Sequence, residues 1–224
     1  MIILITQNCL SILIKFVYNI LLATLVLFSQ IILTMNQLIA VLIFIVFLLC
    51  IFLHYESQYA ELTYVTSTQD GEQYLVRNRK DKHAAANMLA TIKQNLQSIV
   101  EYLRQNNMSD SKVKRLVRKY NPNKISESLP NTNYTSYSVN KGEKLVFCIR
   151  SKKTHKLVDI NTMMFVAIHE LAHVMTKSIG HTDEFWDNMK YLLKKGIKLG
   201  LYRRIDYKKS PVPYCGTEIT DSPL

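Results

Sequence analysis

The most informative part of the sequence is IHELAHVM, at residues 168–175. His169 and His173 are four residues apart, so on a helix both imidazoles leave the same face. Two nitrogen ligands from one rigid helix make half of a tetrahedral zinc site. Glu170 is rotated by about 100° from His169, where it can reach a water molecule beside the metal and act as general base. The segment therefore predicts metal-assisted hydrolysis.

A catalytic zinc ion also needs a third protein ligand and one open position. His181 comes directly after a glycine that is expected to reverse the chain, and this reversal would return its imidazole toward the helix. We therefore expect His169, His173 and His181 to bind one zinc ion. Glu184 is the alternative third ligand, although an acid in the first turn of a helix is also favoured by the helix dipole alone. His155 is a weaker candidate.

The sequence around this motif predicts an α+β domain. A hairpin is expected over 62–77, followed by a long helix over 81–106 and a short basic helix that ends before Asn121-Pro122. Two strands are expected over 137–150, the second at Lys144–Ile149. An apolar helix opened by Asn161 or Thr162 should run from 163 to 178, with Gly180 as its C-terminal cap, and Thr182 should cap the next helix. Residues 123–135 and the tail 201–224 are expected to be irregular.

The N-terminal region has a different composition from the rest of the chain. Of 28 Lys and Arg and 17 Asp and Glu in 224 residues, only Lys15 falls within residues 1–54. Residues 37–55 are apolar and long enough to cross a bilayer, and 16–34 form a second candidate span. We therefore expect a hydrophobic membrane-anchor region over 1–55 and a catalytic domain over 56–224. The alternatives are a cleaved signal peptide or a start at Met35 with a single span.

The composition excludes two classes of protein. Hydrophobic residues make up 48% of the chain, which argues against disorder, and four Cys are too few for a small disulfide-stapled protein. Cys148 and Cys215 are the two cysteines of the domain, and we expect them to be free thiols in a reducing compartment rather than a pair.

The motif residues also resemble a known family. His169-Glu-Leu-Ala-His173, followed by Gly180-His181 and Glu184-Phe185-Trp186, is similar to the minimal zincin metallopeptidases of the WLM and SprT-like type. The resemblance covers about residues 135–200. It implies a small sheet beside an active-site helix, hydrolysis of peptide bonds, and a third histidine ligand after that helix. The Lys-Gly-Glu segment at 141–143 and the Tyr-Cys-Gly segment at 214–216 also resemble WLM-like proteins of large DNA viruses.

The spacing of the third histidine distinguishes this chain from one related group. Seven residues separate His173 from His181, whereas a metzincin has five, so the chain does not match the metzincin pattern. The spacing in SprT-like proteins is variable. Relatives of the WLM and SprT-like type are associated with proteolysis of DNA–protein crosslinks. A nucleic-acid-associated protease is therefore one alternative function, and a zinc-binding interaction protein that has lost turnover is another.

Several further residues are candidates for supporting roles. The strand at Lys144–Ile149 is expected at the sheet edge, where an extended peptide substrate can add to it. Asp183 is a candidate for orienting a ligating histidine. The candidates for stabilising the oxyanion are Tyr191, Tyr202 and Tyr207.

Basic residues dominate the charge of the chain, whose formal net charge is +11. They form two groups, which are candidates for binding nucleic acid or anionic lipid. The first group lies in the short helix and consists of Lys112, Lys114, Arg115, Arg118 and Lys119. The second group lies in and after the last helix and consists of Lys190, Lys194, Lys195, Lys198, Arg203, Arg204, Lys208 and Lys209.

Overall fold

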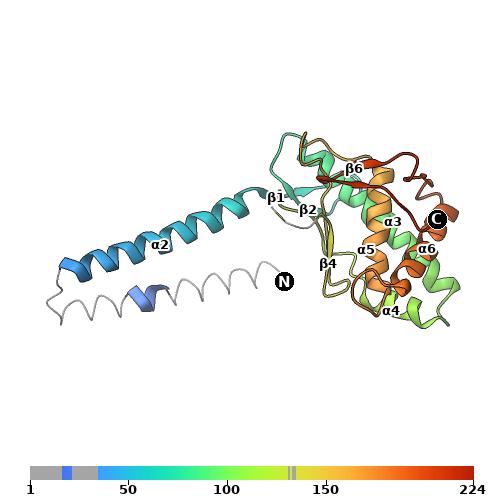
Figure 1. The fold of residues 1–224 in the computed structure, drawn as a ribbon, viewed down its shortest axis with the longest axis horizontal. Coiled ribbons are helices and arrows are strands. Elements are labelled where there is room, and N and C mark those ends of the chain that lie inside the picture. Colours follow the sequence, from blue (N-terminus) through green and yellow to red (C-terminus); the bar gives the residue numbers. More distant parts are fainter. Residues whose placement is uncertain (1–16, 22–34, 131, 133–134) are drawn as a thin grey trace. The chain divides into compact units, whose positions relative to one another are not determined.

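The computed structural model describes residues 17–21, 35–130, 132 and 135–224. Contacts between residues divide the chain into two compact units, Met1–Glu56 and Ser57–Leu224, and each is described by itself (Figure 1). Residues 17–21 are helical. Most of the predicted first span, 16–34, lies outside the described residues.

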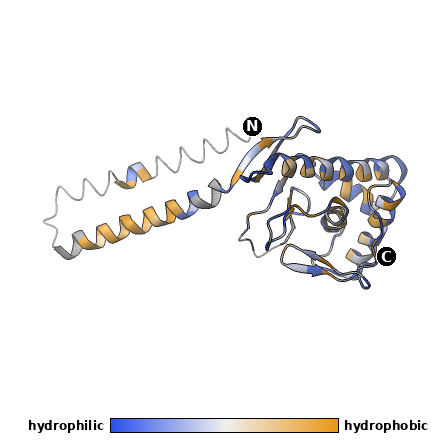
Figure 2. Ribbon diagram, turned by 90° about the horizontal axis from the view of Figure 1, so that it is seen from above, coloured by the Kyte–Doolittle hydropathy of each residue, from blue (hydrophilic) through white to orange (hydrophobic). Residues whose placement is uncertain are grey.

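Helix α2 (Met35–Ala60) contains the predicted span 37–55. By length and composition, its segment Ile39–Glu56 is suited to crossing a membrane. Its large apolar side chains are about half exposed, and in Figure 2 the middle of the helix ribbon is coloured as hydrophobic. A helix that is apolar on all sides lies either in the core of a large protein or in a membrane.

The second unit is α+β, as predicted, and it is built on a five-stranded sheet with the order β1-β2-β3-β5-β4. The hairpin β1 (Leu62–Thr66) and β2 (Gln73–Arg77) is antiparallel, as expected from the Asp-Gly turn. Strand β3 (Ile125–Glu127) pairs in parallel with β2 and with β5 (Lys144–Phe147). Strand β4 (Tyr137–Val139) is antiparallel to β5 and forms one edge of the sheet.

Four helices form the core together with this sheet. Helix α3 (Lys82–Asn106) packs on the sheet, and α4 (Ser111–Lys119) follows it. Helix α5 (Ile160–Met175), which carries the histidine motif, contacts α3, α4, β4 and α6 (Asp183–Lys198). Twelve of the 16 residues of α5 are buried, so packing on several sides holds the helix and its two histidines in fixed positions.

Two predictions about strands were wrong. Strand β5 is interior rather than at the edge, because β3 pairs with it on the side opposite β4. Three-residue strands such as β3 are too short to show an alternating pattern, and its segment was expected to be loop. The tail is also not wholly irregular, since β6 (Val212–Tyr214) and β7 (Thr217–Ile219) form a hairpin. Its turn places Cys215 and Gly216 at positive φ, as a tight hairpin turn requires.

The ends of α5 also differ from the prediction. Asp159 caps its N-terminus by accepting a hydrogen bond from the backbone N–H of Thr162, at 3.0 Å. The helix ends at Met175, because Thr176 has extended backbone angles. Gly180 is therefore not the helix cap. It has positive φ (82°) and lies within the loop that connects α5 to α6.

Candidate metal centre

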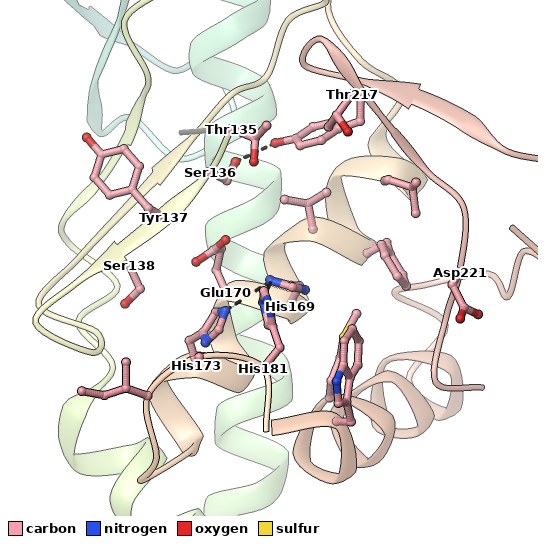
Figure 3. Close-up of a pocket in the computed structure, with 18 of the residues that line it drawn as sticks. Thr135, Ser136, Tyr137, Ser138, His169, Glu170, His173, His181, Thr217 and Asp221 are labelled. Carbon is pink, nitrogen blue, oxygen red and sulfur yellow. Dashed lines mark hydrogen bonds between the residues drawn. The ribbon is translucent and has the colours of Figure 1, made fainter. Parts of the chain in front are cut away.

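Helix α5 brings His169 and His173 together on one face, as their spacing predicts. Their Nε2 atoms are 3.2 Å apart. The loop after α5 then returns the chain, so that the Nε2 atom of His181 lies 3.1 Å from that of His169. The possible ligand atoms of all three histidines lie within 4.8 Å of one another (Figure 3). The structure thus assembles the three predicted ligands around one point.

The spacing of these nitrogen atoms fits a zinc ion. With Zn–N bonds of about 2.0–2.1 Å, neighbouring nitrogens of a tetrahedral site are about 3.3 Å apart. The two short separations, 3.1 and 3.2 Å, are close to that value. His173 and His181 lie within 4.8 Å of each other. The donor set, three imidazoles without a thiolate, is that of a catalytic rather than a structural zinc site.

The electrostatic environment keeps the helix histidines neutral. Burial, with a smaller contribution from the neighbouring histidines, lowers the pKa of His169 to about 3. Burial also lowers the pKa of His173 to about 4. Neutral imidazoles have a free lone pair at neutral pH, which is the form that binds a metal.

Two aromatic residues of α6 support the three rings. The ring of Phe185 is fully buried and lies 4.3 to 4.9 Å, between centroids, from the rings of all three histidines. Trp186 lies 5.6 Å from His181 on the outer side. These contacts fix the orientation of the imidazoles by packing and give the centre an apolar support.

The loop that carries His181 is held from both sides by charged residues. The carboxylate of Glu184 accepts hydrogen bonds from the backbone N–H of Lys177 (2.9 Å) and of Ser178 (3.0 Å), and from the Ser178 hydroxyl (2.8 Å). On the other side, the Nζ of Lys141 donates to the carbonyls of Thr176, Lys177 and Ser178, at 3.0, 2.7 and 2.6 Å. The Glu184 carboxylate therefore accepts its hydrogen bonds from the loop. Glu184 is not part of the group of residues that could hold a metal ion, which consists of the three histidines.

Glu170 extends from α5 into the same pocket (Figure 3). It is 4% exposed, and among the described residues no hydrogen bond holds its carboxylate. Burial raises its pKa to about 8. A carboxyl group with a pKa near neutrality, in a cleft and beside three histidines, is suited to accept and release a proton.

The histidines and Glu170 line a cleft of about 740 Å³. One wall is formed by residues 135–138, at and before the edge strand β4, and another by the tail at and after the β6–β7 hairpin. The hydroxyls of Ser136 and Tyr214 are hydrogen-bonded to each other across this cleft, at 2.6 Å. The edge strand beside the active-site helix is therefore β4, not Lys144–Ile149.

The other supporting candidates lie elsewhere. Tyr202 and Tyr207 are buried against Phe165, and none of the three candidate tyrosines lines the cleft. Among the described residues the tyrosines that do so are Tyr137 and Tyr214. Sequence reasoning missed Tyr214, although its Tyr-Cys-Gly segment had been noted.

The structure also places the remaining candidate acid and the remaining candidate histidine. Asp183 is exposed in the first turn of α6, and among the described residues it has no hydrogen bond to a histidine. His155 is not part of the histidine group.

The prediction of free thiols was wrong. Cys148 and Cys215 form a disulfide, with their Cα atoms 6.1 Å apart and a sequence separation of 67. The tail hairpin brings Cys215 to the end of β5, a contact that the sequence did not reveal because the tail was expected to be irregular. The disulfide and the Ser136–Tyr214 hydrogen bond both fix the tail wall of the cleft to the sheet.

Comparison with known proteins places the chain among viral relatives. No family model matches it. It is 37% identical over 170 residues to the uncharacterized protein R325 of Acanthamoeba polyphaga mimivirus, which corresponds to 74% of this chain and 86% of that protein. Over 68 residues, 30% of this chain and 42% of the relative, it is 44% identical to the uncharacterized protein 042R of Invertebrate iridescent virus 3.

Two solved structures are also similar to part of the chain. The crystal structure of Wss1 from Saccharomyces cerevisiae matches 56% of this chain and 86% of its own, with a TM-score of 0.43 and 17% identity. A Wss1 mutant gives a TM-score of 0.42 with 18% identity, over 57% of this chain and 91% of its own. The expectation of viral relatives is confirmed, and the identity and coverage of the mimivirus match show that the chain belongs to the family of the mimivirus protein R325.

Proposed function

We propose that this protein is a zinc-dependent peptidase in which His169, His173 and His181 hold the metal and Glu170 is the general base. The observation that carries the proposal is the convergence of three imidazole nitrogens at one end of a cleft that Glu170 also lines. A purely structural zinc site has no use for a buried, unpaired carboxyl group at this position.

In the proposed mechanism the metal ion and the protein side chains have separate chemical roles. A bound zinc ion would polarise the scissile carbonyl and acidify water, and its positive charge would oppose the rise in the pKa of Glu170 that burial causes. Glu170 takes the proton from water at its carboxylate and later delivers it to the leaving amine. Phe185 and the packed body of α5 exclude bulk water from the inner side of the site, which strengthens these electrostatic interactions.

The shape of the cleft supports a polypeptide substrate. Strand β4 is at the sheet edge and its residues line the cleft, so an extended peptide can add to the sheet and pass over the histidines. We assign the hydroxyl of Tyr214, on the tail wall of the cleft, as the candidate donor to the developing oxyanion.

We also propose that α2 anchors the protein in a membrane. The support is the 18-residue apolar segment Ile39–Glu56 and the exposure of its side chains. At 1.5 Å per residue a span of this length covers nearly all of a bilayer core of about 30 Å. The peptidase would then act on polypeptides near the membrane surface.

The activity is tested on the full chain in detergent, with zinc added and a library of unstructured peptides as substrate. Wild type should cleave peptides, and Glu170→Gln should lose about 100-fold or more in rate while keeping its zinc. Glu101→Gln, at an exposed position of α3, is the matched control and should cleave normally. Equal rates for Glu170→Gln and wild type would contradict the proposed role of Glu170. Cleavage that survives removal of the metal by a chelator would contradict the zinc mechanism.

A further inference from the structure

A second cavity, away from the histidines, is lined mainly by basic residues. It has a volume of about 690 Å³ and lies between the end of β2 and the turn that follows β5. A smaller cavity of about 290 Å³ shares Arg77 and His155 with it and reaches Arg150. The six cationic side chains that line the two cavities are Arg77, Arg79, Lys80, Arg150, Lys152 and Lys156. The three acidic side chains are Glu61, Asp81 and Glu127. The acids are therefore too few to balance the cations.

Arg77 is the central unpaired charge of this region. The residue is 8% exposed and lines both cavities. Its backbone N–H donates to Glu127, but among the described residues its guanidinium has no hydrogen bond and no ion pair. Glu127 and Glu61 attract its charge, but neither carboxylate forms an ion pair with it, so its donors remain available to an anion in the cavity.

Two neighbouring groups also have unused donors or acceptors. Arg150 binds Glu127 through Nε and Asp81 through Nη1, but its Nη2 is buried without a partner. The Nδ1 of His155 is likewise buried without a partner. Repulsion by Arg79, together with burial, lowers the pKa of His155, which is consistent with an excess of positive charge around the cavity.

The backbone holds His155 in this position at an energetic cost. Its φ is 58°, in the left-handed region that non-glycine residues rarely adopt. The turn is fixed by hydrogen bonds from Ser151 N–H to the Lys156 carbonyl and from His155 N–H to the Ser151 carbonyl, both 2.9 Å. Strained residues of this kind are concentrated at ligand-binding positions.

We propose that this cavity binds a phosphate group, either of a lipid headgroup or of a soluble phosphate ester. The fork of Arg77 matches two phosphate oxygens, and Arg79, Lys80 and Lys156 supply further positive charge around it. A phosphate carries more charge and more acceptor oxygens than a carboxylate, so it satisfies more of these donors. This inference is independent of the proposed peptidase activity.

Chain connectivity gives the lipid a natural route to the cavity. Glu61 lines the cavity, and its carbonyl accepts a hydrogen bond from the N–H of Asn78, at 2.8 Å. Glu61 directly follows the last residue of α2 and is five residues beyond Glu56, the end of the apolar segment. Five residues span at most about 18 Å, so a membrane that contains α2 would have its headgroups within reach of the cavity.

The binding test uses the full chain in a non-ionic detergent, titrated with sn-glycerol 3-phosphate in a calorimeter. Wild type should bind one equivalent, and glycerol should not bind. Arg77→Gln and Arg79→Gln should each weaken binding by about tenfold or more, because each loses charge-assisted hydrogen bonds. Arg118→Gln, on the exposed face of α4, removes the same charge elsewhere and should bind normally. Absence of saturable binding, or equal weakening by Arg118→Gln, would overturn the proposal.

Because Arg77 is buried, its variant can fail to fold, so the test also uses Arg79→Gln at a less buried position and Arg77→Lys. Arg77→Lys keeps the charge but loses the fork, and it should bind more weakly than wild type and more tightly than Arg77→Gln. Unchanged affinity in a folded Arg79→Gln and a folded Arg77→Lys would refute the site.

A second arm separates the two sources of phosphate. The chain is purified from mixed micelles of phosphatidic acid and phosphatidylcholine, and the retained lipid is counted by native mass spectrometry. If the source is a lipid, wild type retains one phosphatidic acid, Arg79→Gln loses it, and glycerol 3-phosphate displaces it. Binding of glycerol 3-phosphate without retained phosphatidic acid assigns the cavity to a soluble ester.

Discussion

Glu184→Gln tests how the chain positions its third histidine. The Glu184 carboxylate accepts three hydrogen bonds from Lys177 and Ser178, within the loop that leads to His181. A glutamine has one acceptor oxygen, and its amide group would face N–H donors, so at least one bond is lost. Each such bond is charge-assisted, but the site is largely exposed, so the loop should lose about 1–2 kcal/mol.

This loss should appear in the affinity for zinc. If His181 binds the metal only when the loop is ordered, the apparent zinc affinity is proportional to the fraction of molecules in which the loop is ordered. A change of about 1–2 kcal/mol corresponds to a decrease of about 5- to 30-fold. The assay is competition for zinc between the full chain and a chromophoric chelator at neutral pH.

Two comparison variants make the result decisive. Asp183→Asn removes the same charge from the adjacent residue, which is exposed and, among the described residues, forms no side-chain hydrogen bond to the loop, and it should bind zinc like wild type. His181→Ala removes a ligand and should weaken binding far more than Glu184→Gln. If Glu184→Gln weakened zinc binding more than His181→Ala does, Glu184 would be the third ligand and the reasoning would be refuted. Equal zinc affinity in Glu184→Gln and wild type would show that the Glu184 carboxylate does not position the loop that carries His181.

Further predictions concern stability and pH. The backbone N–H groups of Lys177 and Ser178 lower the pKa of Glu184 to about 2, so its contribution is complete above pH 4.5 and is lost as pH falls toward 2. The protection of the loop amides against hydrogen exchange, taken relative to the intrinsic exchange rate at each pH, should fall over that window, and a loss of this protection above pH 5 would contradict the prediction. Cys215→Ser should lower the free energy of unfolding by about 4 kcal/mol, the chain-entropy value for this loop length, measured by urea denaturation under oxidising conditions; no change would argue against the disulfide. Glu127→Ala leaves the buried Arg150 without its Nε partner and should cost about 3–5 kcal/mol in the same assay, whereas a cost below 1 kcal/mol would show that this pair is unimportant.

The sequence predicted the centre of the site better than its surroundings. The spacing of His169 and His173 is sufficient because a helix converts a four-residue interval into a shared face. The position of His181 was also anticipated, although for a partly wrong reason. The helix ends at Met175, five residues before Gly180, and the returning loop is held by Lys141 and Glu184.

The features that sequence reasoning missed depend on contacts between distant segments. Strand β3 has three residues and becomes a strand only because β2 and β5 flank it, so β5 became interior. The Cys148–Cys215 disulfide and the Ser136–Tyr214 hydrogen bond join residues more than 60 positions apart. No local pattern reports such pairs. The unpaired Arg77 could likewise be recognised only once its burial was known.

The most direct test of the central claim is the zinc content of the purified full chain, measured for wild type, Glu170→Gln and His181→Ala. The account predicts one zinc per chain in wild type and in Glu170→Gln, because Glu170 is not a ligand, and a marked loss in His181→Ala. A folded wild-type protein that binds no zinc would contradict the account. Full zinc retention in His181→Ala would contradict the three-histidine centre.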